Sequence, residues 1–154
     1  KPGLLTDSNG TVLGHHKGIE FYTIGQRRGL EIKSTVPLYV TAIDPDSGII
    51  TLGPDSELFQ SKLFADKVSW ISGKPPEAGS EVMVKIRYNA TETPGRLFAT
   101  ANNTTHVELY DMQRAITPGQ AVVFYRGDEV IGGGRITRPP QPISALKNSS
   151  ILHA

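Results

Sequence analysis

The sequence contains no cysteine among its 154 residues. This absence excludes disulfides, thiolate metal ligands and a thiol nucleophile within the chain, and it fits a reducing, cytoplasmic setting. No apolar run approaches the roughly 20 residues that a membrane-spanning helix needs, so we expect no membrane partner. The formal net charge is only +1. Any anionic partner must therefore be recognised through the arrangement of basic residues rather than through their total.

Turn-forming residues, by contrast, are abundant, with 16 glycines and 11 prolines. Turn-forming residues at this frequency favour short strands over long helices. A short helical turn is expected near residue 56, before a strand centred on 67–71, and residues 81–88 alternate as a further strand with Val82, Val84, Ile86 and Tyr88 on one side. Hairpins are expected over residues 3–15, 38–52, 95–110 and 121–136.

These elements predict a mainly β protein with two parts. Residues 1–61 form a small β-rich unit, and residues 62–138 form about six strands that close into a Greek-key barrel or a sandwich. Residues 139–154, with three prolines at the start and little pattern, are expected to be an extended tail.

Two motifs invite a chemical interpretation that their context does not favour. His15, His16 and Glu20 carry metal-ligand atoms, but adjacent residues of a strand point to opposite faces, so a shared ion would need a further ligand. We expect no metal site. The run Gly132–Gly134 lies inside an expected strand rather than before a helix, so it indicates a bulge or a close backbone approach rather than a phosphate-binding loop. No hydrolytic motif is present, and we expect no catalytic residue in this chain.

Basic residues interleaved with aromatics are the most informative pattern. Such pairs can hold phosphates and stack on unpaired bases, although ordinary core aromatics beneath a solvated surface would look the same. The pairs are Lys17 with Phe21, Tyr22, Arg27 and Arg28; Lys85 and Arg87 with Tyr88; and Arg126 with Tyr125.

Three segments together resemble a known family. They are YTIGQRRGL at 22–30, preceded by GHHKG, then VKIRYNATETPG at 84–95, and AITPGQAVVFYRGDEVIGGGRI at 115–136. In the same order, they resemble the C-terminal part of the bacterial tRNA-specific 2-thiouridylases, which are tRNA-uridine 2-sulfurtransferases. Arg28 stands where that family more often has lysine, which keeps the charge.

The resemblance implies a small central domain followed by a six-stranded β-barrel similar to the second domain of elongation factor Tu. It implies a parent enzyme that uses ATP and magnesium to activate C2 of the wobble uridine, position 34, and a catalytic cysteine persulfide that delivers sulfur. The phosphate-binding loop and both cysteines of that family belong to an N-terminal domain. Because this chain has neither, we expect it to be inactive alone.

The resemblance also implies partners and contact residues. The expected partners are tRNA, the missing N-terminal catalytic domain, and a sulfur-relay protein or cysteine desulfurase. Positions matching the family's tRNA contacts are Arg87, Tyr88 and Gln120, whose side chains can pair with a phosphate, stack, or present a donor and an acceptor. Lys17, Arg27 and Arg28 are expected to face RNA or the catalytic domain.

Two other interpretations remain open at this point. A free-standing β-barrel adaptor for RNA or protein would need no catalytic domain, although the start at Lys1 favours a piece of a longer protein. A small metal-dependent enzyme built on His15, His16 and Glu20 is the second alternative.

Overall fold

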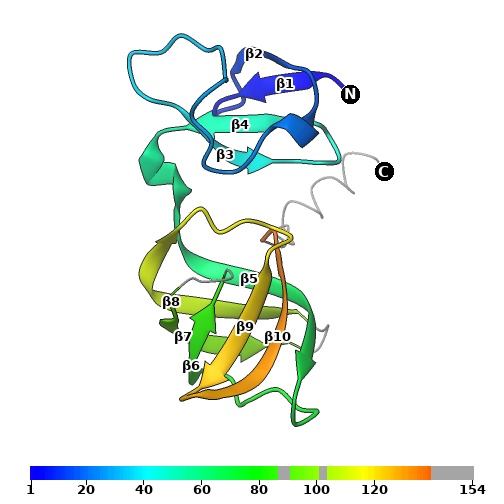
Figure 1. Ribbon diagram of the computed structural model, residues 1–154, viewed down its shortest axis with the longest axis vertical. Helices are drawn as coiled ribbons and strands as arrows, with labels where there is room; N and C mark the ends of the chain where they lie inside the picture. Colours follow the sequence, from blue (N-terminus) through cyan, green and yellow to red (C-terminus); the bar gives the residue numbers. More distant parts are fainter. Residues whose placement is uncertain (87–90, 101–103, 140–154) are drawn as a thin grey trace, which may run out of the picture. The chain divides into compact units, whose positions relative to one another are not determined.

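The computed structural model describes residues 1–86, 91–100 and 104–139. Contacts between Cα positions divide the chain into two compact units. The first unit consists of Lys1–Ser61 with Asp111–Thr117, and the second of Lys62–Tyr110 with the residues from Pro118 onward. In both units the regular secondary structure consists mainly of strands, as the sequence predicts (Figure 1).

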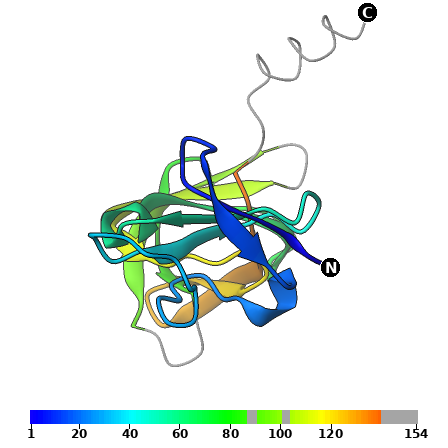
Figure 2. The same cartoon turned by 90° about the horizontal axis from the view of Figure 1, so that it is seen from above.

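The first unit contains a four-stranded sheet in the order β2-β1-β4-β3. Its strands are β1 (Gly3–Thr6), β2 (Val12–His16), β3 (Tyr39–Ile43) and β4 (Ile50–Gly53). The antiparallel pairs β1–β2 and β3–β4 confirm the two hairpins predicted there. The parallel pairing of β1 with β4, which joins the two hairpins into one sheet, had no signal in the sequence. Figure 2 shows the dark-blue β1–β2 hairpin from above.

Aspartates organise both hairpin turns of this sheet. One carboxylate oxygen of Asp7 accepts hydrogen bonds from the backbone N–H groups of Asn9 and Thr11, each at 2.9 Å. Asp44 accepts one from the N–H of Asp46 at 3.0 Å and another from the hydroxyl of Ser47 at 2.9 Å. These are the side-chain-to-backbone contacts that make aspartate common in turns.

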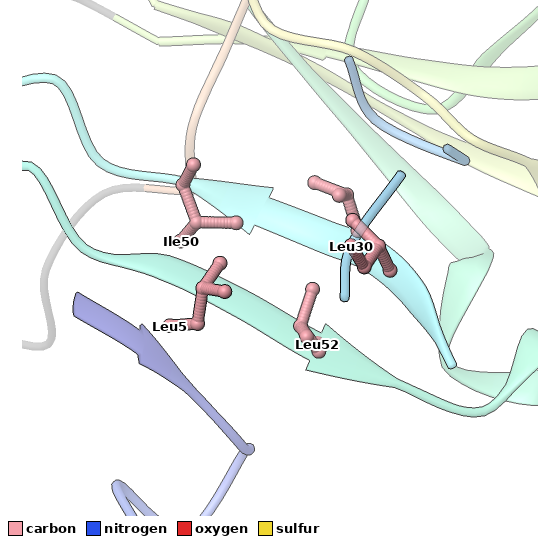
Figure 3. Close-up of a cluster of buried hydrophobic side chains, with 5 residues drawn as sticks. Leu5, Leu30, Ile50 and Leu52 are labelled. Atoms are coloured by element: carbon pink, nitrogen blue, oxygen red, sulfur yellow. The ribbon is translucent and has the colours of Figure 1, made fainter. Parts of the chain in front are cut away.

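A compact aliphatic cluster holds the first unit together. Leu5 from β1 packs with Val40 from β3 and with Ile50 and Leu52 from β4, and none of the four exposes more than 1% of its surface. Leu30 joins them from the loop between Phe21 and β3 (Figure 3). The loop is therefore tied to the sheet by a buried side chain in its middle.

The second unit is a closed barrel in the strand order β10-β5-β8-β7-β6-β9. This confirms the six-stranded barrel and shows that the sandwich alternative is wrong. Its strands are β5 (Phe59–Trp70), β6 (Ser80–Lys85), β7 (Thr93–Ala99), β8 (Thr105–Arg114), β9 (Ala121–Arg126) and β10 (Glu129–Thr137), and two 3-10 helices, η1 (Ile19–Phe21) and η2 (Asp55–Leu58), lie earlier in the chain.

Alternation along the barrel strands places the core as the sequence suggested. Val82, Val84 and Ile86 are buried, and Val84 is fully inaccessible. The strand expected to be centred on residues 67–71 is β5, which begins at Phe59 and therefore lies further toward the N-terminus than predicted. Burial alternates through Leu63 and Ala65, and then changes phase at Lys67, where φ is 52°. This irregularity hid the first half of the strand.

The glycine run in β10 allows close contact with both neighbouring strands. A Cβ on Gly132 would lie 2.7 Å from the carbonyl oxygen of Ser69, and one on Gly133 would lie 2.8 Å from that of Val122. The pairing of β10 with β5 also shifts register between Gly133 and Arg135. The prediction of a bulge and a close backbone approach is confirmed.

Within the described ranges, none of the helices has the length and apolar character needed to cross a membrane.

Substitution of Gly134 tests this packing. A Cβ there would lie 2.6 Å from the carbonyl oxygen of Asp66 and 2.8 Å from a methyl group of Val68. We expect Gly134→Ala to lower the free energy of unfolding by about 2 kcal/mol, the usual range for overpacking. Urea unfolding followed by circular dichroism measures this. The control is Glu129→Ala on the same strand, an exposed position where we expect a change within about 0.5 kcal/mol. Equal midpoints for the two variants would contradict the packing argument.

Candidate functional site

The residues singled out from the sequence fall in different places. Arg87 and Tyr88 lie outside the described residues. Gln120 immediately precedes β9 in the second unit, whereas Lys17, Arg27 and Arg28 belong to the first unit. Each group is described within its own unit.

Gln120 is held by two backbone hydrogen bonds that continue the pairing of β9 with β10. The N–H of Gly119 donates to the carbonyl oxygen of Ile136 at 2.7 Å, and the N–H of Ile136 donates to the carbonyl oxygen of Gln120 at 2.8 Å. Gly119 has a φ of 93°, a conformation open to glycine at little cost. The half-buried Gln120 side chain therefore starts from a fixed backbone position at this end of the barrel.

Arg135 lies beside Gln120, and the sequence analysis missed it. One terminal nitrogen of its guanidinium donates to the carbonyl oxygen of Gly119 at 3.1 Å. Within the described ranges, no carboxylate lies within 4.0 Å of this group. A guanidinium has five N–H donors, so most of its donors remain available to an anion. The basic residue was visible in the sequence, but its proximity to Gln120 follows only from the pairing of Ala121 with Arg135.

In the first unit, most apolar side chains of the segment 14–38 serve the core. Ile19, Tyr22 and Ile24 are partly buried against the aliphatic cluster. Tyr22 also contacts His16 edge to face, with ring centroids 5.5 Å apart. Phe21 is the exception among the aromatic residues, because it is 68% exposed. Apart from Phe21, the aromatic part of this motif thus has a packing role.

Gln26 fixes the turn that carries the two arginines. Gly25 donates its N–H to the carbonyl oxygen of Val40 at 2.7 Å, and Val40 donates to that of Gln26 at 2.9 Å. The side-chain amide of Gln26 accepts from the N–H of Thr23 at 3.0 Å and donates to the carbonyl oxygen of Arg28 at 2.9 Å. The sequence contained Gln26 inside the motif, but its bracing role required the structure.

Basic side chains differ in whether a protein group already engages them. Arg114 forms an ion pair with Asp55 at 2.8 Å, and Lys62 approaches Glu108 at 4.0 Å. Arg96 donates to the hydroxyl of Tyr110, and this hydrogen bond is the main cause that raises the pKa of Arg96 above its ordinary value. Tyr110 in turn donates to Glu81 at 2.9 Å. These basic side chains already interact with other side chains of the protein.

A second set of basic side chains has no such engagement. Across the part of the chain that the structure describes, no carboxylate pairs with any of them within 4.0 Å. All of them are exposed. In the first unit the set includes Lys17, Arg27, Arg28 and Lys33, and Lys67, Lys74 and Arg126 of the second unit share this property. Lys33 was not singled out from the sequence because it lacks an aromatic neighbour.

The two histidines behave as adjacent strand residues should. His15 is exposed and His16 is 3% exposed. The Nε2 atom of His16 lies 2.6 Å from the carbonyl oxygen of Gly48, which ties β2 to the β3–β4 turn. Over residues 1–86, 91–100 and 104–139, no group of three metal-binding side chains gathers. His16 thus has a packing role in the first unit. Its Nδ1 atom is buried without a hydrogen-bond partner.

Glu31, which lies between Arg28 and Lys33 in the sequence, has an unfavourable backbone conformation. Its φ is 58°, in the left-handed region that costs non-glycine residues about 1–2 kcal/mol. Glycine avoids this cost but loses more backbone entropy on folding. We expect Glu31→Gly to raise the free energy of unfolding by ~0.5 to 1 kcal/mol. Urea unfolding measures it, with Glu20→Gly in η1 as the control. Glu20 is an exposed glutamate that is absent from the positive-φ residues, and its replacement should be destabilising.

Comparisons with known proteins match both units. The family model described as tRNA methyl transferase PRC-barrel domain matches residues 1–54, and the one described as aminomethyltransferase beta-barrel domain matches residues 60–136.

Similar proteins carry the name tRNA-specific 2-thiouridylase MnmA. The one from Halothermothrix orenii is 43% identical over 136 residues, which are 88% of this chain and 38% of that protein. Those from Chlorobium chlorochromatii and Roseiflexus sp. are 46% and 45% identical over 87% and 90% of this chain, and 37% of each protein is covered. The chain thus spans less than two fifths of these relatives, and it belongs to the tRNA-specific 2-thiouridylase family.

Proposed function

We propose that the chain is the tRNA-binding part of an ATP-dependent tRNA 2-thiouridylase that thiolates C2 of uridine 34. The observation that carries this is the match of both β units to relatives bearing that name, over 88% of the chain and 38% of one relative. The remainder of such an enzyme would supply the chemistry. This chain would position tRNA against it.

The residues of the chain support this division of labour. It contains no cysteine, so any persulfide carrier must come from elsewhere. The glycine run in β10 is paired with strands on both sides, which leaves it unable to cradle the phosphates of ATP. ATP, magnesium and the sulfur-relay protein or desulfurase are therefore assigned to the rest of the enzyme, and we propose that the chain alone is inactive.

Exposed cations that lie more than 4.0 Å from any described carboxylate support a role in RNA binding. Side chains that already pair with a carboxylate release little on meeting a phosphate, whereas unpaired ones displace counterions from the nucleic acid. The first unit presents Lys17, Arg27, Arg28 and Lys33, and the second presents Arg135 beside Gln120.

Fluorescence anisotropy with labelled tRNA tests the proposed function directly. We expect the 154-residue chain to bind a tRNA transcript with an affinity that falls steeply as salt rises. A DNA duplex of equal length should bind more weakly. Absence of tRNA binding at low salt, or equal affinity for the duplex, would refute the proposal.

Arg87, which lies outside the described residues, remains the first candidate for a phosphate contact. We expect Arg87→Ala to weaken tRNA binding by about 1–3 kcal/mol. The matched control is Arg96→Ala, which removes the same charge from a side chain already bonded to Tyr110. A filter-binding titration that gives the two variants the same affinity would remove Arg87 from the interface.

Arg135 is a further candidate because of its position next to Gln120. We expect Arg135→Ala to weaken tRNA binding by about 1 kcal/mol and to reduce the slope of log affinity against log salt by about one. Gln120→Ala should lower affinity without changing that slope, since glutamine carries no charge. Salt titrations of both variants separate the two effects, and an unaltered slope for Arg135→Ala would contradict the assignment.

A further inference from the structure

We propose that residues 27–38, which we call the basic loop, form a binding site for one phosphate group of the RNA backbone, with Lys33 as a principal ligand. The proposal rests on the proposed function, because it takes RNA as the partner. The basic loop lines an open pocket of about 530 Å3, and both Arg27 and Lys33 belong to this lining. The family resemblance pointed to Arg27 and Arg28 but gave no role to Lys33 or to the cavity.

The basic loop is anchored at several points along its length. Leu30 is 7% exposed within the aliphatic cluster of the first unit, and Ile32 and Leu38 pack against the same cluster. A Cβ on Gly14 would lie 2.9 Å from the terminal methyl group of Ile32, so the glycine makes room for this anchor. A loop fixed in this way loses less conformational entropy on binding a ligand than a free one.

The first residues of the basic loop are held in place by Gln26. Gln26 is bound to β3 through the backbone of Val40, and its side chain donates to the carbonyl oxygen of Arg28. Arg27 and Arg28 therefore project from a braced turn. The polar lining is thus held in place by apolar anchors and by the Gln26 amide.

Between the anchors, the loop exposes groups that suit a phosphate. Lys33, Ser34 and Thr35 are consecutive and exposed. The hydroxyl oxygen of Ser34 accepts a hydrogen bond from the N–H of Val36 at 3.3 Å, so its own proton remains available to an anionic oxygen. An ammonium group and two hydroxyls can together satisfy several phosphate oxygens.

The charge of the basic loop also favours an anion. Arg27, Arg28 and Lys33 carry three positive charges against the single negative charge of Glu31. None of the three cations lies within 4.0 Å of a described carboxylate. An excess of positive charge that the protein leaves unneutralised attracts polyanions. Phosphate is favoured over a protein carboxylate because the family to which the chain belongs is named for tRNA.

The test compares Lys33→Ala with Lys74→Ala in the 154-residue chain. Lys74 is an exposed loop lysine of the second unit, so the two variants change charge equally. We expect Lys33→Ala to bind a tRNA transcript about tenfold more weakly and to reduce the slope of log affinity against log salt by about one. Lys33→Arg should restore the slope. Thermal unfolding checks that the variants are folded.

Chemical-shift mapping locates the contact. In the 15N-labelled chain, titration with tRNA should shift the amide signals of residues 33–36, and titration with inorganic phosphate should shift the same signals. If the wild-type chain binds tRNA but Lys33→Ala matches Lys74→Ala in affinity and slope, the basic loop is not the site, and the proposed function stands. If the wild-type chain fails to bind tRNA, the proposed function fails as well. Shifts with polyglutamate but not with tRNA would assign the loop to an acidic protein and overturn the proposal.

Discussion

Closure of the barrel depends on β10, which must pair with β5 on one side and with β9 on the other. Three consecutive glycines permit this, because each lies where a Cβ would meet a backbone oxygen of a neighbouring strand. Closure removes the free edges at which strands of other chains could add. It also brings the guanidinium of Arg135 to the carbonyl oxygen of Gly119, so the same constraint that completes the barrel places a basic side chain at the turn that carries Gln120.

The first unit is an open sheet of four strands rather than a closed barrel. Four strands bury one small aliphatic cluster, and the long connection between η1 and β3 contributes Leu30 to it. Leu30, Ile32 and Leu38 of this connection pack in the core, while its basic residues stay exposed. The connection is therefore both part of the fold and the carrier of Arg27, Arg28 and Lys33, which explains why glycine, aliphatic and basic residues are interleaved there.

The sequence predicted those features that local patterns determine. Alternation identified β6, turn residues identified both hairpins of the first unit, and the position of the glycine run inside a strand indicated a bulge. Features that depend on distant pairing were not accessible. The parallel contact of β1 with β4 has no local signature, and the phase change at Lys67 concealed the start of β5. Among the site residues, Arg135 and Lys33 gain their significance from neighbours and from missing partners, which a linear pattern does not contain. Arg87 and Tyr88 stay predictions.

The segment Asp111–Thr117 has a consequence for how the protein can be divided. Arg114 from this segment pairs with Asp55 and lies over the ring of Tyr39, with 5.7 Å between its Cζ and the ring centroid. Ala115 donates its N–H to the carbonyl oxygen of Leu58 at 2.9 Å. A cut in the chain at residue 61 would leave the N-terminal piece without a segment that comes from far along the sequence. The first unit is therefore assembled from two separate stretches of the chain, and a piece that ended at residue 61 would lose the contacts that Tyr39, Asp55 and Leu58 make with the second stretch.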